Sequence, residues 1–213
     1  MNPKRVLVAV AAAVTALTLL SACGGEEKGV DIHGTVLDAS RPVAADELTT
    51  TDGGTFSLVD DSTKPLTLVF FGYTRCPDIC PAVMSSVAAG LTKLSDAQRK
   101  QVQLVFVTTD PKRDTDKVLA DYVSRFDPSF RALTGDIRTI SKVALSLGVF
   151  VDKGEALPGG GYDPNSHGAN VIGINAEHRA LIAWDGETSP SQFASDFEFL
   201  VTKKPDRLEG PNG

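Results

Sequence analysis

Between residues 66 and 71 the chain carries a continuous run, Leu-Thr-Leu-Val-Phe-Phe, and this run constrains the fold more than any other segment. A strand shows so little polarity when it is buried on both faces of a sheet, with other elements covering both sides. Met84, Val87, Leu91 and Leu94 follow at spacings of three and four residues, which is the apolar stripe of an amphipathic helix. The two patterns together predict the first half of a strand–helix–strand unit.

The same alternation continues along the chain. Two more strands are expected at residues 102–107 and 130–133, because both segments are apolar. Asp114 is expected to cap a helix that runs to about Phe126, and Asp136 a second helix that Gly148 ends. The residues expected to face the core are Val118, Tyr122 and Phe126 in the first helix and Ile140, Val143, Ala144 and Leu147 in the second.

The two ends of this unit add further strands and a last helix. The additional strands are expected at residues 32–37, 55–59, 169–174 and 180–184, the last two as a hairpin. Ser189, Pro190 and Gln192 predict a helix start with a cap, a first-turn proline and a capping-box partner. Strands that alternate with helices imply a largely parallel sheet, to which the hairpin adds antiparallel pairing. We therefore predict an α/β fold, a thioredoxin-like sandwich with a mixed central sheet and an N-terminal strand extension.

The first 22 residues have the three parts of an export signal: a basic start, an apolar run over residues 6–20, and small residues before Cys23. The apolar run is shorter than the ~20 residues of a membrane span. Leu-Ser-Ala before Cys23 resembles a bacterial lipobox, whose cysteine is acylated and becomes the mature N-terminus; the alternative is an ordinary signal peptide with an incidental cysteine. We expect a lipoprotein signal peptide at 1–22, a tether from the acylated Cys23 to 30, the folded domain at 31–203 and a flexible tail at 204–213. The expected location is the outer face of the cell membrane.

The charge balance excludes some partners. Removing Lys4 and Arg5 with the export signal changes the formal net charge from −6 to −8. An acidic chain of this kind does not suit nucleic acid, which demands a basic face. It also offers no basic patch for lipid headgroups, so attachment to a membrane would depend on the acyl chains.

Cys76 and Cys80 stand where the buried strand ends and the helix begins, in the sequence Cys-Pro-Asp-Ile-Cys-Pro. Ligands of open α/β sheets bind at this edge, and a helix N-terminus favours thiolate, so we expect at least one thiol pKa below the ~8.5 of free cysteine. The spacing permits a disulfide, a redox pair or a shared metal. A structural disulfide would close a short loop and contribute only ~2 kcal/mol. Asp78, between the cysteines, is expected to point away and cap the helix.

A third metal ligand is available from a loop. His167 follows the glycine-rich residues 159–166 and precedes an expected strand, so the loop can bring its imidazole over the cysteines; the alternative is an exposed loop histidine. His33 and His178 are expected in surface or packing roles. Two thiolates and an imidazole suit Cu(I) and Cu(II), although zinc could use the same ligands plus water. With only two methionines in the chain, a methionine-rich copper motif is not available, and we expect one mononuclear site.

Several segments together resemble the Sco/SenC family of copper-binding proteins linked to cytochrome c oxidase assembly, over roughly residues 55–200. They are Phe71-Gly72-Tyr73-Thr74, Cys76-Pro77-Asp78-Ile79-Cys80-Pro81, Asp110-Pro111-Lys112-Arg113-Asp114-Thr115, Phe126-Asp127-Pro128, Leu133-Thr134-Gly135 and Ser166-His167. The resemblance implies a thioredoxin-like fold, with Cys76 and Cys80 as thiolate ligands and His167 as the imidazole ligand of copper. It also implies delivery of copper to the dinuclear copper centre of the oxidase, or reduction of that centre's cysteines. The implied partners are the copper-site subunit of the oxidase and an upstream copper donor.

Two segments depart from the family pattern, both away from the expected ligands. The stretch between Val59 and Leu66 is short, and residues 175–179 lack the more usual Asp-x-x-Gly turn. Asp110 ends a strand beside the cysteine edge. It is either a group just outside the metal ligands or a cap of the loop before Pro111.

Three functions follow as hypotheses. The first is a copper metallochaperone, which is a binding and transfer protein and not an enzyme. The alternatives are a thiol–disulfide oxidoreductase acting on the oxidase subunit and a copper or redox sensor. His167 discriminates between the first two, because copper binding needs it while thiol exchange needs only the cysteines.

Overall fold

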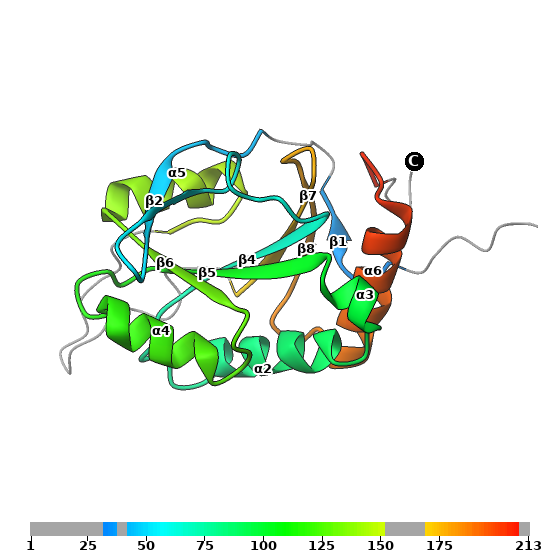
Figure 1. The fold of residues 1–213 in the computed structure, drawn as a ribbon, viewed down its shortest axis with the longest axis horizontal. Coiled ribbons are helices and arrows are strands. Elements are labelled where there is room, and N and C mark those ends of the chain that lie inside the picture. The colour runs from blue at the N-terminus through cyan, green and yellow to red at the C-terminus, as the bar shows by residue number, and fades with distance from the viewer. Residues whose placement is uncertain (1–31, 38–41, 152–168, 209–213) are drawn as a thin grey trace, which may run out of the picture. The chain divides into compact units, whose positions relative to one another are not determined.

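The computed structural model describes residues 32–37, 42–151 and 169–208. Within these residues eight strands form one sheet, in the order β1-β8-β7-β4-β5-β6-β2-β3 (Figure 1). The predicted signal peptide, Cys23, the tether, the end of the tail and His167 lie outside the described residues.

The centre of the sheet is parallel. β4 (Leu66–Gly72) pairs in parallel with β5 (Val102–Thr108), which pairs in parallel with β6 (Arg131–Thr134). On the other side of β4, the hairpin of β7 (Val171–Asn175) and β8 (Ala180–Trp184) adds antiparallel pairing. The predicted mixed sheet is therefore confirmed. Because β4, β5 and β6 run in one direction, the segments that follow them meet at one edge.

Helices cover both faces of the sheet (Figure 1). On one face lie α2 (Ile79–Leu91), α4 (Asp116–Ser124) and α6 (Pro190–Lys203), together with the short α3 (Asp96–Arg99). On the other face lies α5 (Ile137–Ser146). Successive residues of a strand point to opposite faces, so β4 sends Leu68 and Phe70 to the first face and Val69 and Phe71 to the second. This division explains why the run from residue 66 carries so little polarity.

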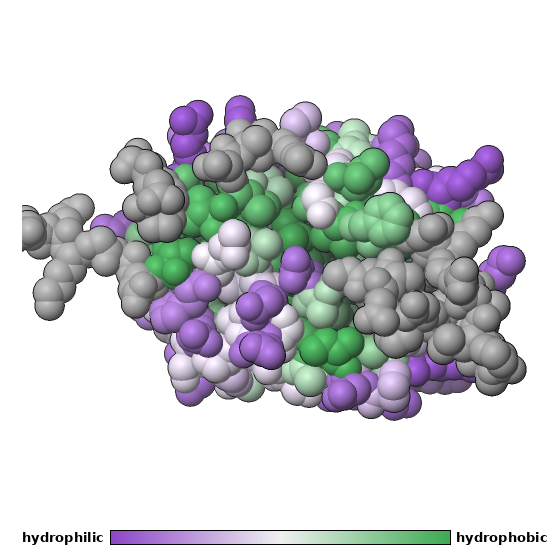
Figure 2. Space-filling view, turned by 180° about the vertical axis from the view of Figure 1, so that it is seen from behind, coloured by the Kyte–Doolittle hydropathy of each residue, from purple (hydrophilic) through white to green (hydrophobic). Residues whose placement is uncertain are grey.

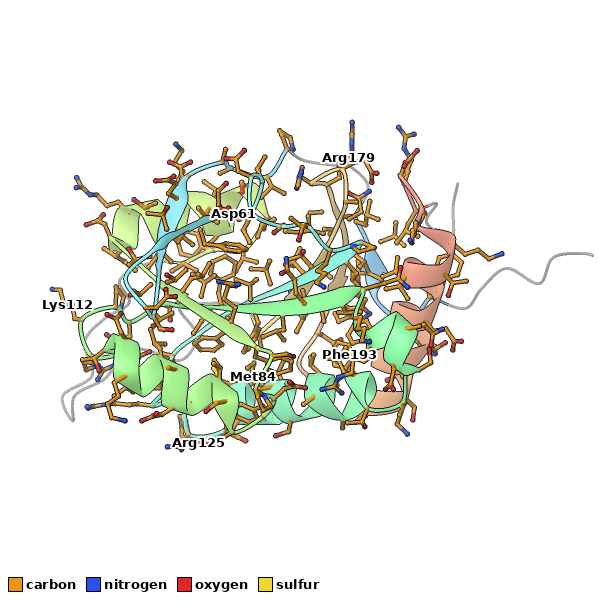
Figure 3. All side chains as sticks on the ribbon, in the orientation of Figure 1. Asp61, Met84, Lys112, Arg125, Arg179 and Phe193 are labelled. Carbon is orange, nitrogen blue, oxygen red and sulfur yellow. The ribbon has the colours of Figure 1, made fainter. Side chains whose placement is uncertain are left out.

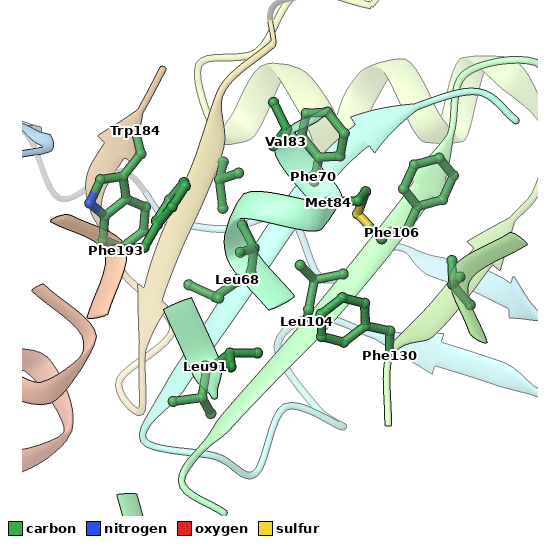
Figure 4. Packing of buried hydrophobic residues seen from close by; sticks show 14 of the residues in the cluster. Leu68, Phe70, Val83, Met84, Leu91, Leu104, Phe106, Phe130, Trp184 and Phe193 are labelled. Carbon is green, nitrogen blue, oxygen red and sulfur yellow. The ribbon is translucent and has the colours of Figure 1, made fainter. Parts of the chain in front are cut away.

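The core under α2, α4 and α6 is built on large side chains. Phe70 and Phe106 pack at 6.0 Å between ring centroids, and Met84 reaches from α2 toward the sheet beside them (Figures 3 and 4). Trp184 and Phe193 extend the same cluster toward α6, at 5.7 Å. Burial of each such side chain contributes ~1.5–3 kcal/mol. This cluster supports the N-terminal end of α2, which carries Cys80.

The N-terminal extension differs from its prediction. β1 (Thr35–Val36) and β3 (Thr55–Ser57) are both shorter than expected, and a further strand, β2 (Glu47–Thr50), lies in the stretch predicted to be without one. β2 pairs with both β3 and β6 in antiparallel fashion. Its sequence, Glu-Leu-Thr-Thr, has a single strongly apolar residue, Leu48, so a reading based on apolar runs does not detect it.

Most helix boundaries agree with their predictions, but the predicted cap of α4 was wrong. Asp136 caps α5, and Ser189 forms the predicted capping box with Gln192. In α4 the cap is Thr115, whose side chain accepts from the N–H of Val118, whereas Asp114 is buried and bonded elsewhere.

The buried face of α4 differs from the predicted one at one position. Val118 is exposed and Leu119 is buried in its place, while Tyr122 faces the core as expected. Phe126 packs against the same core from just beyond the helix. The short α3 was not predicted, because its sequence Asp-Ala-Gln-Arg has no apolar stripe.

Large apolar side chains also reach the surface. On the side turned away in Figure 1, apolar groups lie between charged ones (Figure 2). Among the described residues, the exposed large hydrophobic side chains are Val118, Leu145 and Phe150. Within residues 32–37, 42–151 and 169–208, the structure contains no helix with both the length and the apolar character needed to cross a membrane.

Candidate metal centre

The two cysteines lie at the edge of the sheet where β4 ends. Between Gly72 and the start of α2 the chain makes a turn in which the N–H of Cys76 donates to the carbonyl of Tyr73 at 3.2 Å. Cys80 belongs to the first turn of α2, and its N–H donates to Cys76 Sγ at 3.4 Å. The helix N-terminus is thus directed at the Cys76 sulfur, an arrangement that stabilises negative charge on it.

Neither cysteine is in a disulfide, and both are buried. Cys80 is 0 % exposed and Cys76 is 6 % exposed. A Cβ placed on Gly72 would lie 2.9 Å from Cys80 Sγ and 3.0 Å from Phe106 Cε2. Any larger residue at this position would therefore displace the sulfur, so a glycine is needed where the strand approaches the site.

The two sulfurs differ in their electrostatic surroundings. A side-chain hydrogen bond with Cys76, followed by burial, raises the pKa of the Cys80 thiol. The direction is opposite to the one expected for a thiol at a helix N-terminus, because the first-turn N–H is directed at Cys76 Sγ and not at Cys80. Cys80 therefore does not meet the expectation of a low thiol pKa. Burial and the neighbouring cysteines likewise raise the pKa of Tyr73, whose hydroxyl hydrogen-bonds to Cys76.

A buried carboxylate, Asp114, holds the cysteine turn in place. It accepts hydrogen bonds from the N–H and hydroxyl of Thr74, at 3.0 and 2.6 Å, and from the hydroxyl of Thr108 at 2.7 Å. Sequence reasoning assigned Asp114 to a helix cap and gave no role to the two threonines. The sequence did contain a signal for these two residues, because Thr74 and Asp114 both lie in segments that resemble the Sco/SenC family.

Asp110 organises the loop that follows β5. Its carboxylate forms an ion pair with Arg113, and its carbonyl accepts from the N–H groups of Arg113 and Asp114 at 3.1 and 3.0 Å. These contacts favour the loop-cap interpretation over a direct role at the sulfurs. Beside it lies a pocket of about 390 Å³, and exposed Lys112 extends outward from the same loop (Figure 3). The pocket is lined by Thr109, Asp110, Pro111, Lys112, Gly135, Asp136 and Ile137.

Asp78 agrees with its prediction in one respect only. The side chain is exposed and so points away from the sulfurs, as expected. It occupies the N-cap position of α2 without making a side-chain capping hydrogen bond, so the predicted cap was wrong.

The start of β7 lies at the same edge of the sheet as the cysteines. Val171, at the start of β7, pairs with Phe70 near the end of β4. Ile79 and Ala169 both lie close to Gly186, because a Cβ built on Gly186 would be 2.8 Å from Ile79 Cδ1 and 3.5 Å from Ala169 Cβ. Ala169 is therefore near Ile79, the residue that precedes Cys80. His167 stands two residues before Ala169 and lies outside the described residues.

The other two histidines lie elsewhere. His33 hydrogen-bonds through Nδ1 to the buried Asp196 at 2.9 Å, which agrees with the expected packing role. His178 lies in the turn of the β7–β8 hairpin with a positive φ of 55°, at the opposite end of β7 from Val171. Among the described residues, no three His, Cys, Asp or Glu side chains are grouped so that they could hold a metal ion.

The fold and the site define a thioredoxin-like α/β protein with two buried thiols at the carboxyl edge of its parallel strands. A family model described as SCO1/SenC matches residues 38–202. The chain therefore belongs to the SCO1/SenC family.

Individual relatives agree with this assignment. A SCO2-like protein of Rickettsia felis is 32% identical over 160 residues, which cover 70% of this chain and 75% of that protein. Protein SCO1 homolog 1, mitochondrial, of Arabidopsis thaliana is 38% identical over 112 residues, or 48% of this chain. That match spans only 34% of the length of the Arabidopsis protein.

Solved structures show the same fold. The apo Sco1 protein from Thermus thermophilus superposes with a TM-score of 0.66 at 27% identity, covering 83% of this chain and 97% of that one. ScoI of Bradyrhizobium japonicum, solved with copper bound, gives a TM-score of 0.61 at 28% identity, covering 74% of this chain and 98% of that one.

Proposed function

We propose that this protein binds one copper ion through Cys76, Cys80 and His167 and delivers it to the dinuclear copper centre of cytochrome c oxidase. The observation that carries the proposal is the pair of thiols just beyond the end of β4, with the start of β7 at the same edge of the sheet. Copper is the cargo of this activity. The copper-bound Bradyrhizobium relative supports copper over zinc as the metal.

The residues at the site fit a soft metal ion. Two sulfurs on successive turns of chain can bind one ion from the same side, and thiolates favour Cu(I). Cys76 already accepts an N–H from the helix, which stabilises its charged form. Cys80 has to lose its proton when the metal binds, because burial and Cys76 keep it neutral in the absence of metal. An imidazole from residue 167 would complete three-coordinate binding and also suit Cu(II).

The placement of the site at a sheet edge suits transfer. Arg75, Pro77 and Asp78 are exposed around the buried sulfurs, so a partner protein can approach the turn directly. We propose the copper-site subunit of the oxidase as the acceptor and a separate protein as the copper donor. A three-ligand site leaves room for an acceptor ligand to bind before the ion is released.

A second candidate is reduction of the acceptor's cysteines by Cys76 and Cys80. The observation that favours it is that both cysteines are in the thiol form and not joined in a disulfide. Its chemistry needs a thiolate that attacks a disulfide sulfur and a second thiol that resolves the mixed disulfide, but it needs no histidine. The two functions therefore differ in their dependence on His167.

Oxidase activity in cells distinguishes these functions. We expect His167→Ala to lose oxidase assembly about as fully as Cys76→Ser, when both variants are present at the level of the wild-type protein. His178→Ala, which changes a histidine at the opposite end of β7, serves as the control and should keep assembly. Near-normal oxidase activity in His167→Ala, with none in Cys76→Ser, would overturn copper delivery and favour the oxidoreductase.

We also propose the domain organisation and location that the N-terminal sequence predicts. Residues 1–22 act as a lipoprotein signal peptide, and residues 23–30 link an acylated Cys23 to the domain at 31–203, which the tail at 204–213 follows. The support is the Leu-Ser-Ala sequence before Cys23. Acylation would hold the copper site at the outer face of the cell membrane, close to a membrane-bound oxidase.

A further inference from the structure

We propose that Asp114 is the positioning residue of the cysteine site, acting through hydrogen bonds that fix the turn at residues 73–76 against the end of β5. The inference rests on the proposed role of Cys76 and Cys80 as the functional pair. Asp114 belongs to the loop before α4, whereas the cysteine turn that it positions belongs to the loop before α2.

The contacts of Asp114 join two segments that are far apart in the chain. Its side chain is 1 % exposed and accepts from both polar groups of Thr74 and from the hydroxyl of Thr108. Thr108 is the last residue of β5, a strand held in the centre of the sheet. The carboxylate thus connects the turn that carries Cys76 to a strand in the centre of the sheet.

Thr74 transmits this restraint to the sulfurs. It lies between Tyr73, whose carbonyl accepts from the N–H of Cys76, and Cys76 itself. Cys76 Sγ in turn accepts from the N–H of Cys80. If Thr74 moves, the Cys76 sulfur loses its alignment with the helix N-terminus, and the turn no longer covers Cys80.

The pattern of donors around Asp114 allows the effect of its hydrogen bonds to be tested separately from the effect of its negative charge. One oxygen of Asp114 accepts from the Thr74 N–H and the Thr108 hydroxyl, and the other accepts from the Thr74 hydroxyl. Asparagine can keep all three hydrogen bonds, because its amide N–H₂ can donate to the Thr74 hydroxyl, which accepts equally well. Asp114→Asn therefore removes the charge and keeps the geometry, whereas Asp114→Ala removes both.

A second buried aspartate provides a matched control. Asp127 is 5 % exposed and accepts from the N–H and hydroxyl of Ser129 at 2.8 and 2.7 Å, and it forms an ion pair with Arg99. Asp127 lies before β6, at the edge of the sheet opposite to the cysteines. Asp127→Ala removes a comparable set of hydrogen bonds without touching the cysteine turn.

The test measures alkylation of Cys80 by iodoacetamide in the reduced, metal-free protein, by mass spectrometry of the peptides at several times. Loss of hydrogen bonds to a charged group corresponds to about a tenfold change or more in an opening equilibrium. We expect Asp114→Ala to raise the Cys80 rate by at least that factor. Asp114→Asn and Asp127→Ala should stay near the wild-type rate. Thr74→Val keeps the hydrogen bond from the backbone N–H of residue 74 to Asp114 and should give a smaller increase in the Cys80 rate. This variant replaces Asp114→Ala in the test if Asp114→Ala does not fold.

Three results would overturn the proposal. They are an unchanged Cys80 rate in both Asp114→Ala and Thr74→Val, an equal increase in Asp127→Ala, and an Asp114→Asn rate as high as that of Asp114→Ala. The second would indicate general destabilisation and the third an effect of charge. Because no copper is present, the result stands apart from the proposed function, which fails if the wild-type protein does not bind copper.

Discussion

At the scale of single residues, the site depends on contacts that bring backbone and sulfur close together. Gly72 lets β4 approach Cys80, and the first turn of α2 directs an N–H at Cys76. The sequence indicated the two cysteines because their spacing and position are visible in it. It could not indicate the roles of Gly72 or Asp114, because these depend on which side chains the sheet brings together.

The contact at Gly72 can be tested by adding one methyl group. Gly72→Ala should displace the Cys80 sulfur and lower the affinity for Cu(I) by at least about tenfold, or ~1.4 kcal/mol. Overpacking should also lower the free energy of unfolding by ~1–3 kcal/mol. Competition with a Cu(I) chelator and denaturant unfolding measure the two effects.

Gly173→Ala is the matched control for this experiment. A Cβ there would lie 2.7 Å from Ile182 Cγ2 and 2.9 Å from Trp184, so it overpacks the sheet away from the cysteines. It should destabilise the protein and leave the copper affinity unchanged. Equal copper affinities in the two variants would show that Gly72 has no special role at the site.

At the scale of elements, predictions were correct where the pattern was strong. The continuous apolar strands, the cap at Asp136 and the capping box at Ser189 are local features, and all three were correctly predicted. β2 was missed because tertiary pairing with β3 and β6 stabilises a strand with little apolar character. The cap at Asp114 was wrong because a buried network at the sheet edge recruits that carboxylate, and Thr115 takes its place.

One such tertiary contact fixes the start of the domain to α6. The fully buried carboxylate of Asp196 accepts from the N–H and Nδ1 of His33, the N–H of Gly34 and the indole N–H of Trp184. Asp196→Ala should lower the free energy of unfolding by about 3 kcal/mol, because buried donors lose their acceptor. It should also shift the indole N–H resonance of the single tryptophan.

Asp185→Ala serves as the control for this contact. Asp185 is exposed and accepts from Glu187 and Thr188 in a local turn, so its loss should cost less than about 0.5 kcal/mol. Denaturant unfolding and the NMR resonance of Trp184 measure both variants. A stability of Asp196→Ala within that same range would contradict the structural role of the carboxylate.

At the scale of the whole molecule, alternating patterns were sufficient to predict the class of fold. A buried strand followed by helix, strand, helix and strand leaves few topologies, and the hairpin then has to pair with an edge of the parallel strands. The resemblance supplied the candidate ligands. The spatial relation between the cysteines and the segment before β7 became visible only in the register of β7 against β4.

The proposed membrane anchor belongs to the same scale. Cys23→Ser should move the protein from the membrane fraction to the soluble fraction or leave its signal peptide uncleaved, because the acyl chains are lost. Cys76→Ser, which changes a different cysteine, should remain with the membranes. Cell fractionation and intact-mass measurement of the mature chain test this expectation. A wild-type chain that begins after residue 23, or carries no acyl group at Cys23, would refute it.

The most direct test of the account is electron paramagnetic resonance of the protein during titration with Cu(II). We expect one copper per chain in the wild-type protein, with hyperfine coupling from one imidazole nitrogen. His178→Ala should give the same spectrum. His167→Ala should lose the nitrogen coupling and most of the Cu(II) binding, because thiolates alone do not complete the site. Unchanged nitrogen coupling in His167→Ala, or a wild-type protein that takes up no copper, would contradict the account.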